Sequence, residues 1–183
     1  MKNEYLINFD AISKYTISQL KTILEKTEGI KVKDCLISDL VFYDGKPIYS
    51  GNGVYIFKYN DIFIYVGSCV ARNFVERIPA HFDLRQSGWF NSLLQRILDK
   101  QNKERSNETL AEAGRLAIDN YSLIMINFPL GDHIRNISNI KALETLLRAV
   151  LDPYNTYKHK RKIDELRILN EYLTNTVLVP SVK

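Results

Sequence analysis

Six residues spread along the chain have side chains suited to breaking a phosphodiester bond with the help of a metal ion. They are two tyrosines, an arginine, a histidine, a glutamate and an asparagine: Tyr55, Tyr65, Arg77, His81, Glu144 and Asn155. A planar guanidinium matches phosphate oxygens, a carboxylate binds a hard cation, and a histidine or tyrosine can accept a proton. This chemistry requires a fold that brings the six residues together.

Both tyrosines lie on a predicted β-hairpin from Gly53 to Gly67, where aliphatic and aromatic residues alternate. A three-residue loop centred on Asn60 would place Tyr55 opposite Tyr65 and both hydroxyls on one face. A two-residue loop at Asn60-Asp61 would instead put the tyrosines on opposite faces and mix the aliphatic and aromatic sides. We favour the first register, because a slip of one residue reverses every side chain.

Arg77 and His81 are four residues apart and would share one face of a helix that begins near Asn73. Pro79 stands between them and is tolerated only in a first turn. The helix must therefore begin near Phe74–Glu76 or be distorted. A solvated helix face is the alternative interpretation of this pair.

Glu144 lies on a predicted amphipathic helix over Ser138–Leu151. Its position between Ile140 and Leu147, one turn to either side, directs it toward the core. A carboxylate there is costly unless it is paired or bound to a metal ion. A buried ion pair with an arginine, or a position at the solvent edge of the apolar stripe, is the alternative to a metal ligand.

A run of basic residues follows Asn155, which on its own is typical of a turn. Four members of the run are candidates for contact with a nucleic-acid backbone: Lys158, Lys160, Arg161 and Lys162. A solvated surface is an equal alternative. The net charge of +4 and the pI of about 8.9 are compatible with a nucleic-acid partner but do not identify one.

The length of 183 residues suits one domain with a small elaboration, and a hydrophobic content of 45% is enough for a core. Cys35 and Cys69 have no metal-binding spacing, so we expect reduced thiols and no disulfide. The first residues lack a signal-like apolar run, and no stretch approaches the roughly 18 apolar residues of a membrane span. We therefore expect a soluble cytoplasmic protein that does not contact a membrane.

Periodicity and turn residues predict the remaining elements. In chain order they are a helix over Thr16–Glu28, a small hairpin over Leu40–Tyr49, helices over Phe90–Lys100 and Glu108–Ile118, a strand over Tyr121–Phe128, and a last helix over Ile163–Leu173. Together with the first hairpin they predict an α+β fold, in which a small three-stranded antiparallel sheet is flanked by helices.

Between Gly53 and Asn155 the chain resembles the GIY-YIG nuclease family. Five segments carry the resemblance, in the order in which the family has them: Gly53-Val54-Tyr55, Tyr65-Val66-Gly67-Ser68, Asn73-Phe74-Val75-Glu76-Arg77, Ala142-Leu143-Glu144 and Pro153-Tyr154-Asn155. His81 falls where many members have a histidine or a tyrosine. Each segment is weak alone, whereas five in order are fairly specific.

The resemblance implies hydrolysis of DNA phosphodiesters with one Mg²⁺ or Mn²⁺ ion per active site, bound by Glu144. It implies that Arg77 stabilises charge on the phosphate. Arg72 is an alternative to it, because the connection that leads to Arg77 is longer than in common members. Either Tyr55 or His81 would act as general base, and the residues leave both open.

The same resemblance gives Tyr65 the role of orienting the scissile phosphate and Asn155 that of holding the glutamate segment. It also requires Arg77 and Glu144 to reach the aromatic face of the hairpin. The chain is most similar to restriction endonucleases of the family, with residues 1–50 as an N-terminal extension for DNA or dimer contact and 51–183 as the nuclease domain. Cutting both strands needs two active sites, so we expect a homodimer on double-stranded DNA. A repair or mobile-element nuclease and an inactive DNA-binding module are the alternatives.

Overall fold

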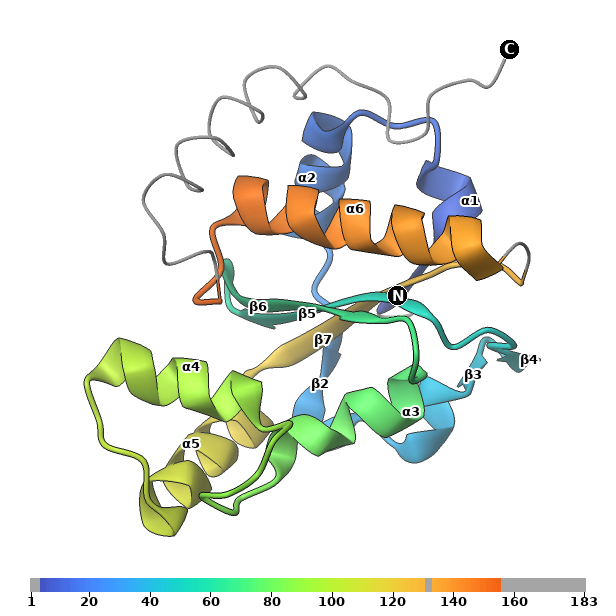
Figure 1. The fold of residues 1–183 in the computed structure, drawn as a ribbon. Coiled ribbons are helices and arrows are strands. Elements are labelled where there is room, and N and C mark those ends of the chain that lie inside the picture. Colours follow the sequence, from blue (N-terminus) through green and yellow to red (C-terminus); the bar gives the residue numbers. More distant parts are fainter. Residues whose placement is uncertain (1–3, 131–132, 156–183) are drawn as a thin grey trace.

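The computed structural model describes residues 4–130 and 133–155 and shows an α+β fold, with one central sheet between two layers of helices (Figure 1). The basic residues at 158–162 and the helix predicted over Ile163–Leu173 lie outside the described residues. Among the helices of the described residues, none is both long enough and apolar enough to cross a membrane.

The sheet has five strands and is mixed. Its main path is β1 (Leu6–Asn8), β7 (Ser122–Asn127), β5 (Gly53–Tyr59) and β6 (Ile62–Cys69), while β2 (Ile30–Lys31) also pairs with β7. The antiparallel centre β6-β5-β7 matches the predicted three strands. The prediction of a sheet with only these three is too small, because β1 joins β7 in parallel and β2 joins it antiparallel. Residues of the N-terminal segment therefore complete the same sheet.

Helices cover both faces of this sheet (Figure 1). One layer contains α1 (Phe9–Ile12), α2 (Ile17–Lys26) and α6 (His133–Leu151), and the other contains α3 (Phe74–Arg77), α4 (Ser92–Gln101) and α5 (Asn107–Asn120). The remaining elements are the short 3-10 helices η1 (Val32–Asp34), η2 (Ile37–Leu40) and η3 (Pro79–Phe82), and the small hairpin of β3 (Phe42–Tyr43) and β4 (Lys46–Pro47). Helices α2, α4, α5 and α6 and the small hairpin confirm the corresponding predictions, with shifts of up to five residues at their ends. The helix predicted from Asn73 ends at Arg77 and does not continue through His81.

The central hairpin divides the core into two clusters, one on each face of the sheet; we call the face that carries Tyr55 and Tyr65 the aromatic face and the other the aliphatic side. Val54, Ile56 and Val66 are buried in the cluster that includes the apolar residues of α2 and α6. Tyr55 and Tyr65 are buried in the other cluster, with residues of α4 and α5. The two tyrosines thus share one face of the sheet, as the sequence predicts.

The register that achieves this differs from the predicted one. Tyr55 pairs with Gly67, and the strands meet at a two-residue loop, Asn60-Asp61. That loop alone would put the tyrosines on opposite faces, but the register shifts next to Phe57 and leaves Ile64 without a partner residue on β5. This β-bulge inserts one extra residue, and the extra residue returns the second tyrosine to the aromatic face. The predicted three-residue loop is wrong, and the predicted shared face is correct.

A buried lysine joins the sheet to the second helix. Lys58 on β5 is almost fully buried, and its ammonium donates to the backbone carbonyls of Leu24, Glu25 and Thr27 at 3.4, 2.7 and 3.2 Å. Leu24 and Glu25 belong to the last turn of α2 and Thr27 is its C-cap, where the helix itself provides no partner and the dipole favours a cation. Lys58 therefore caps α2 and fixes it against the sheet.

We predict that Lys58→Met lowers the free energy of unfolding by about 2 kcal/mol, because three buried carbonyls lose a charged donor. Urea denaturation followed by circular dichroism measures this change. Lys26→Met, at an exposed position in the last turn of the same helix, is the control and should lower the free energy of unfolding less, since an exposed cation at a helix C-terminus contributes about 0.3–1 kcal/mol. Equal stability of Lys58→Met and the parent protein would show that the cap contributes nothing.

Candidate active site

The side chains of two tyrosines and a histidine pack together on the aromatic face of the sheet. The rings of Tyr55 and Tyr65 are stacked with centroids 6.2 Å apart, and His81 lies 5.4 Å from the first and 4.9 Å from the second. The tyrosines come from neighbouring strands and His81 from η3, which begins at Pro79 directly after α3. The proline thus ends the helix predicted through His81 and starts a tighter turn, which still turns the imidazole toward the sheet.

The hydrogen bonds of His81 indicate which nitrogen of its ring carries the proton. The backbone N–H of Leu93 donates to Nδ1 at 3.2 Å, so Nδ1 carries a lone pair. The neutral ring then has its proton on Nε2, which donates to the Tyr55 hydroxyl oxygen at 2.5 Å. Burial, with a smaller contribution from the charge of Arg77, lowers the pKa of His81 to about 3. With both nitrogens engaged, the imidazole positions Tyr55 and is poorly placed to take a proton from water.

Tyr55 is fully enclosed at the centre of this cluster. Its ring lies across Gly67 of the next strand, where a Cβ atom would stand only 2.3 Å from the hydroxyl oxygen. Burial raises the pKa of Tyr55 well above its usual value, Tyr65 adds to this, and the charge of Arg77 opposes it. The hydroxyl is therefore protonated at neutral pH and is influenced by the arginine rather than by solvent.

Tyr65 has a partner that its sequence context does not reveal. Its hydroxyl lies 2.9 Å from Oγ of Ser92, the first residue of α4, and the same Oγ lies 3.4 Å from Nδ1 of His81. Ser92 thus links the second tyrosine to the histidine. No local pattern marks it, because α4 approaches the cluster only through the tertiary fold.

Arg77 is the last residue of α3, a helix of one turn that Asn73 caps by accepting from the backbone N–H of Glu76 at 3.0 Å. Its charge affects Tyr55, His81 and Cys69, all on or beside the aromatic face. The guanidinium groups of Arg72 and Arg77 both lie over the Phe90 ring, at 4.2 and 5.5 Å, but it is the charge of Arg77 that acts on Tyr55 and His81. Of the two candidates, Arg77 is therefore the arginine of the tyrosine cluster.

Glu144 has its own cluster of polar contacts. Its Oε1 accepts from Arg148 at 2.7 Å, and its Oε2 accepts from the Ser68 hydroxyl at 2.6 Å and from Lys141 at 3.1 Å. Lys141 also donates to Ser68 Oγ at 2.8 Å. The carboxylate is nearly buried and is held in the ion pair that was the alternative to a metal ligand.

Asn155 closes the outer edge of β6. Its amide oxygen accepts from the backbone N–H of Val66 at 3.0 Å, and its amide nitrogen donates to the carbonyl of the same residue at 2.7 Å. The N–H of Tyr154 donates to the carbonyl of Ile64 at 2.9 Å, and Arg148 donates to the carbonyl of Val66 at 3.1 Å. The segment after α6 therefore satisfies this edge as a further strand would, and it fixes the helix that carries Glu144.

The expectation that Glu144 reaches the aromatic face is wrong. Helix α6 lies in the layer on the opposite, aliphatic side of the sheet (Figure 1). The carboxylate and the arginine instead belong to helices on opposite sides of the sheet, and the charges of both act on Cys69 at the end of β6. Burial raises the pKa of the Cys69 thiol to about 12. The charge of Arg77 lowers this pKa, and the charge of Glu144 raises it.

A divalent ion fits beside Glu144 on the condition that Lys141 moves away from the carboxylate. No group of three or more histidine, cysteine, aspartate or glutamate side chains suited to a metal lies together in the described residues. Mg²⁺ keeps several waters and needs only one or two carboxylates, so Glu144 is a sufficient protein ligand. Its Oε2 must first lose the ammonium of Lys141. The sequence shows Lys141 and Arg148 as helix neighbours of Glu144, but not that both contact it.

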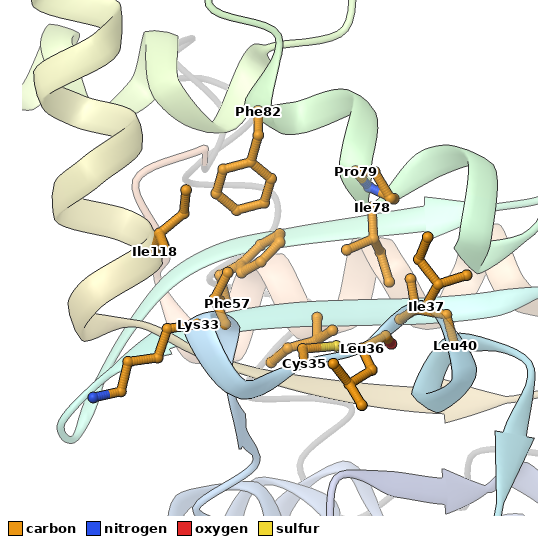
Figure 2. A pocket seen from close by; sticks show the side chains of 12 residues that line it. Lys33, Cys35, Leu36, Ile37, Leu40, Phe57, Ile78, Pro79, Phe82 and Ile118 are labelled. Carbon is orange, nitrogen blue, oxygen red and sulfur yellow. Dashed lines mark hydrogen bonds between the residues drawn. The ribbon is translucent and has the colours of Figure 1, made fainter.

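A separate cavity of about 270 Å³ (Figure 2) is lined in part by Phe57, whose ring also contacts Tyr55 and His81. Apolar side chains line most of it, including Phe57, Ile78 and Phe82, and its lysine, Lys33, points its ammonium away. Burial and, to a lesser extent, Asp39 raise the pKa of the Cys35 thiol at its wall to about 11. The cavity therefore offers space but no activated group.

Comparison of the chain with protein-family models, with curated proteins and with solved structures found no match. The geometry of its own residues is therefore what supports a function.

The buried neutral imidazole makes a prediction about acid stability. Below the ordinary His pKa of about 6.5 the unfolded chain binds a proton at His81 that the folded chain does not, so stability falls as pH decreases toward 3. This single group contributes a slope of up to about 1.4 kcal/mol per pH unit. We expect His81→Gln to show a shallower loss of stability between pH 7 and pH 4 in urea denaturation.

Tyr55→Phe is the control for this measurement, because it keeps the buried imidazole and should keep the parent slope. Identical pH dependence of His81→Gln and the parent protein would contradict a buried neutral histidine.

Proposed function

We propose that this chain is a DNA endonuclease that hydrolyses phosphodiester bonds with one divalent metal ion. Glu144 does not reach the aromatic face that the family resemblance requires, so the proposal rests instead on the action of two opposite charges, from the two sides of the sheet, on one strand end. The guanidinium of Arg77 comes from one helical layer and the carboxylate of Glu144 from the other, and both act on Cys69. A phosphate at this edge would meet a cation from one side and a metal-binding carboxylate from the other, as phosphoryl transfer needs.

On the aromatic side, Arg77 would bind the phosphate and stabilise the charge that develops on its oxygens. Tyr55 and His81 would keep the guanidinium in place, through the hydroxyl that Nε2–H of the histidine holds. Both nitrogens of His81 are engaged, which leaves Tyr55 as the candidate base. Burial raises the pKa of its hydroxyl and the charge of Arg77 opposes this only in part, so that pKa would have to fall further in the presence of a bound metal ion. Tyr65, held by Ser92, would orient the phosphate.

On the other side, Glu144 would hold the Mg²⁺ or Mn²⁺ ion, and Asn155 would keep its helix against β6. When bound, such an ion supplies a Lewis acid for the departing oxygen. Water adds to phosphorus, the bond to the 3′ oxygen breaks, and the proton released from the water ends on the 3′ hydroxyl. The products would be 5′-phosphate and 3′-hydroxyl ends.

Double-stranded DNA as the partner has support from the surface beside Arg77. Phe90 lies under two guanidinium groups, with Arg72 at 4.2 Å and Arg77 at 5.5 Å from its ring. Trp89, next to it, is 90% exposed. Cations and an exposed aromatic ring at one place suit contact with phosphates and bases. Basic residues Lys158, Lys160, Arg161 and Lys162 would add phosphate contacts.

A restriction endonuclease is the form of this activity that we propose, acting as a homodimer so that both strands are cut. A nuclease of repair or of a mobile element would use the same site. The enclosed Tyr55 and the closed ion pair of Glu144 favour a second candidate, a DNA-binding module that does not cut.

Plasmid cleavage with Mg²⁺ separates these candidates. We expect Glu144→Gln to lose at least about thirtyfold in cleavage rate, roughly 2 kcal/mol of transition-state stabilisation, while DNA binding is kept. EDTA should abolish cleavage by the parent protein. Glu112→Gln, which removes a carboxylate paired with Lys103 at the surface, is the matched control and should cut normally.

Cleavage by Glu144→Gln at the parent rate would remove Glu144 from the site. Binding of DNA without cleavage by the parent protein, at any concentration of Mg²⁺ or Mn²⁺, would favour the inactive module.

Trp89 is the only tryptophan of the chain, so its fluorescence reports on one place. We expect DNA to quench this fluorescence in the Glu144→Gln variant, which binds without cutting. Trp89→Ala should weaken binding by about tenfold, as loss of one aromatic contact typically does. Fluorescence anisotropy of labelled duplex measures the affinity.

Tyr59→Ala removes another exposed aromatic ring, at the hairpin turn and outside residues 1–50, and serves as the control, with unchanged affinity expected. Tight DNA binding without quenching, and with Trp89→Ala unaffected, would place the DNA elsewhere on the protein.

A further inference from the structure

We propose that Lys141 acts as an internal cation that occupies Glu144 until DNA draws it away, so that metal binding is coupled to DNA binding. This inference rests on the proposed nuclease function. Lys141 would thereby have a gating role: it would prevent the metal ion from binding to Glu144 until DNA is bound.

The ammonium of Lys141 stands where a metal ion would compete with it. Nζ lies 3.1 Å from Oε2 of Glu144 and 2.8 Å from Oγ of Ser68, and so bridges two oxygens of the polar cluster. A Mg²⁺ ion at the same carboxylate oxygen would sit about 2.1 Å from it. The two positive charges would then be only a few ångströms apart and repel each other strongly. Metal and ammonium therefore exclude one another at Oε2.

The two cations on the carboxylate are not equivalent. The side chain of Arg148 is 20% exposed and binds both Oε1 and the carbonyl of Val66, which fixes it to the strand edge. The side chain of Lys141 is 53% exposed and ends in a flexible stem. Arg148 is thus a permanent partner of Oε1, whereas Lys141 can leave Oε2 without unfolding the helix.

A phosphate of the substrate is the group that would take Lys141. An ammonium binds phosphate as a compact point charge, and the half-exposed side chain of Lys141 is accessible to one. Transfer of the ammonium to a phosphate frees Oε2 for the metal ion. By linkage, DNA then raises the affinity for the metal, and the metal raises the affinity for DNA by the same factor.

Binding of Mn²⁺ to the full chain without DNA tests the first half of this inference, with free Mn²⁺ measured by electron paramagnetic resonance. We expect Lys141→Met to bind Mn²⁺ at least about tenfold more tightly than the parent protein. Lys103→Met is the matched control, because Lys103 forms a 2.8 Å ion pair with Glu112 at the surface, and its removal should change nothing. Adding Glu144→Gln to Lys141→Met should abolish the tight binding.

The second half needs DNA. A short duplex with an uncleavable phosphate analogue should raise the Mn²⁺ affinity of the parent protein at least about fivefold, and that of Lys141→Met much less. Lys141→Gln keeps a polar side chain and should behave like Lys141→Met. Agreement between the two variants would show that the effect comes from loss of the positive charge and not from misfolding of one variant.

Equal Mn²⁺ affinities of the parent protein and both Lys141 variants, in a protein that cuts DNA, would overturn the gating role and leave the nuclease function intact. Failure of every variant to bind Mn²⁺, together with absence of cleavage, would overturn both.

Discussion

The outer edge of β6 is the constraint on which the candidate site depends. An edge strand exposes unpaired N–H and C=O groups, and here Val66 and Ile64 find partners in Asn155, Arg148 and Tyr154 rather than in another strand. Because the segment after α6 makes these bonds, the helix that carries Glu144 is held in register with the strand that carries Tyr65. Side-chain and backbone groups close this edge without covering it as a full strand would, so both helical layers reach it.

Buried polar groups elsewhere in the molecule are similarly paired. Lys58 is surrounded by carbonyls, His81 lies between an amide and a hydroxyl, and Glu144 lies among two cations and a serine. No buried side-chain nitrogen or oxygen of the described residues lacks a hydrogen-bond partner. Such satisfied clusters are costly to disturb, so any catalysis must rearrange them locally. The exposed Lys141 is where rearrangement costs least.

The sequence was sufficient for the shared face of Tyr55 and Tyr65, for a helix that begins near Asn73, and for Glu144 on the inner side of its helix. It was insufficient for the hairpin register, because a bulge at Ile64 has no signal in an unbroken run of apolar residues. It also missed the strands at Leu6–Asn8 and Ile30–Lys31, which are too short for a periodic pattern and exist only through pairing with β7. The layer from which Glu144 approaches is a property of topology, which helix periodicity does not encode.

The central claim is that Arg77 and Glu144, from opposite layers, act on one phosphate at the end of β6. Crystals of the protein with an uncleavable DNA duplex and Mn²⁺, measured at the manganese absorption edge, test it directly. We predict one manganese ion bound to Glu144 and to an oxygen of the same phosphate that the Arg77 guanidinium contacts. DNA bound elsewhere, or manganese and guanidinium on different phosphates, would contradict a single shared site.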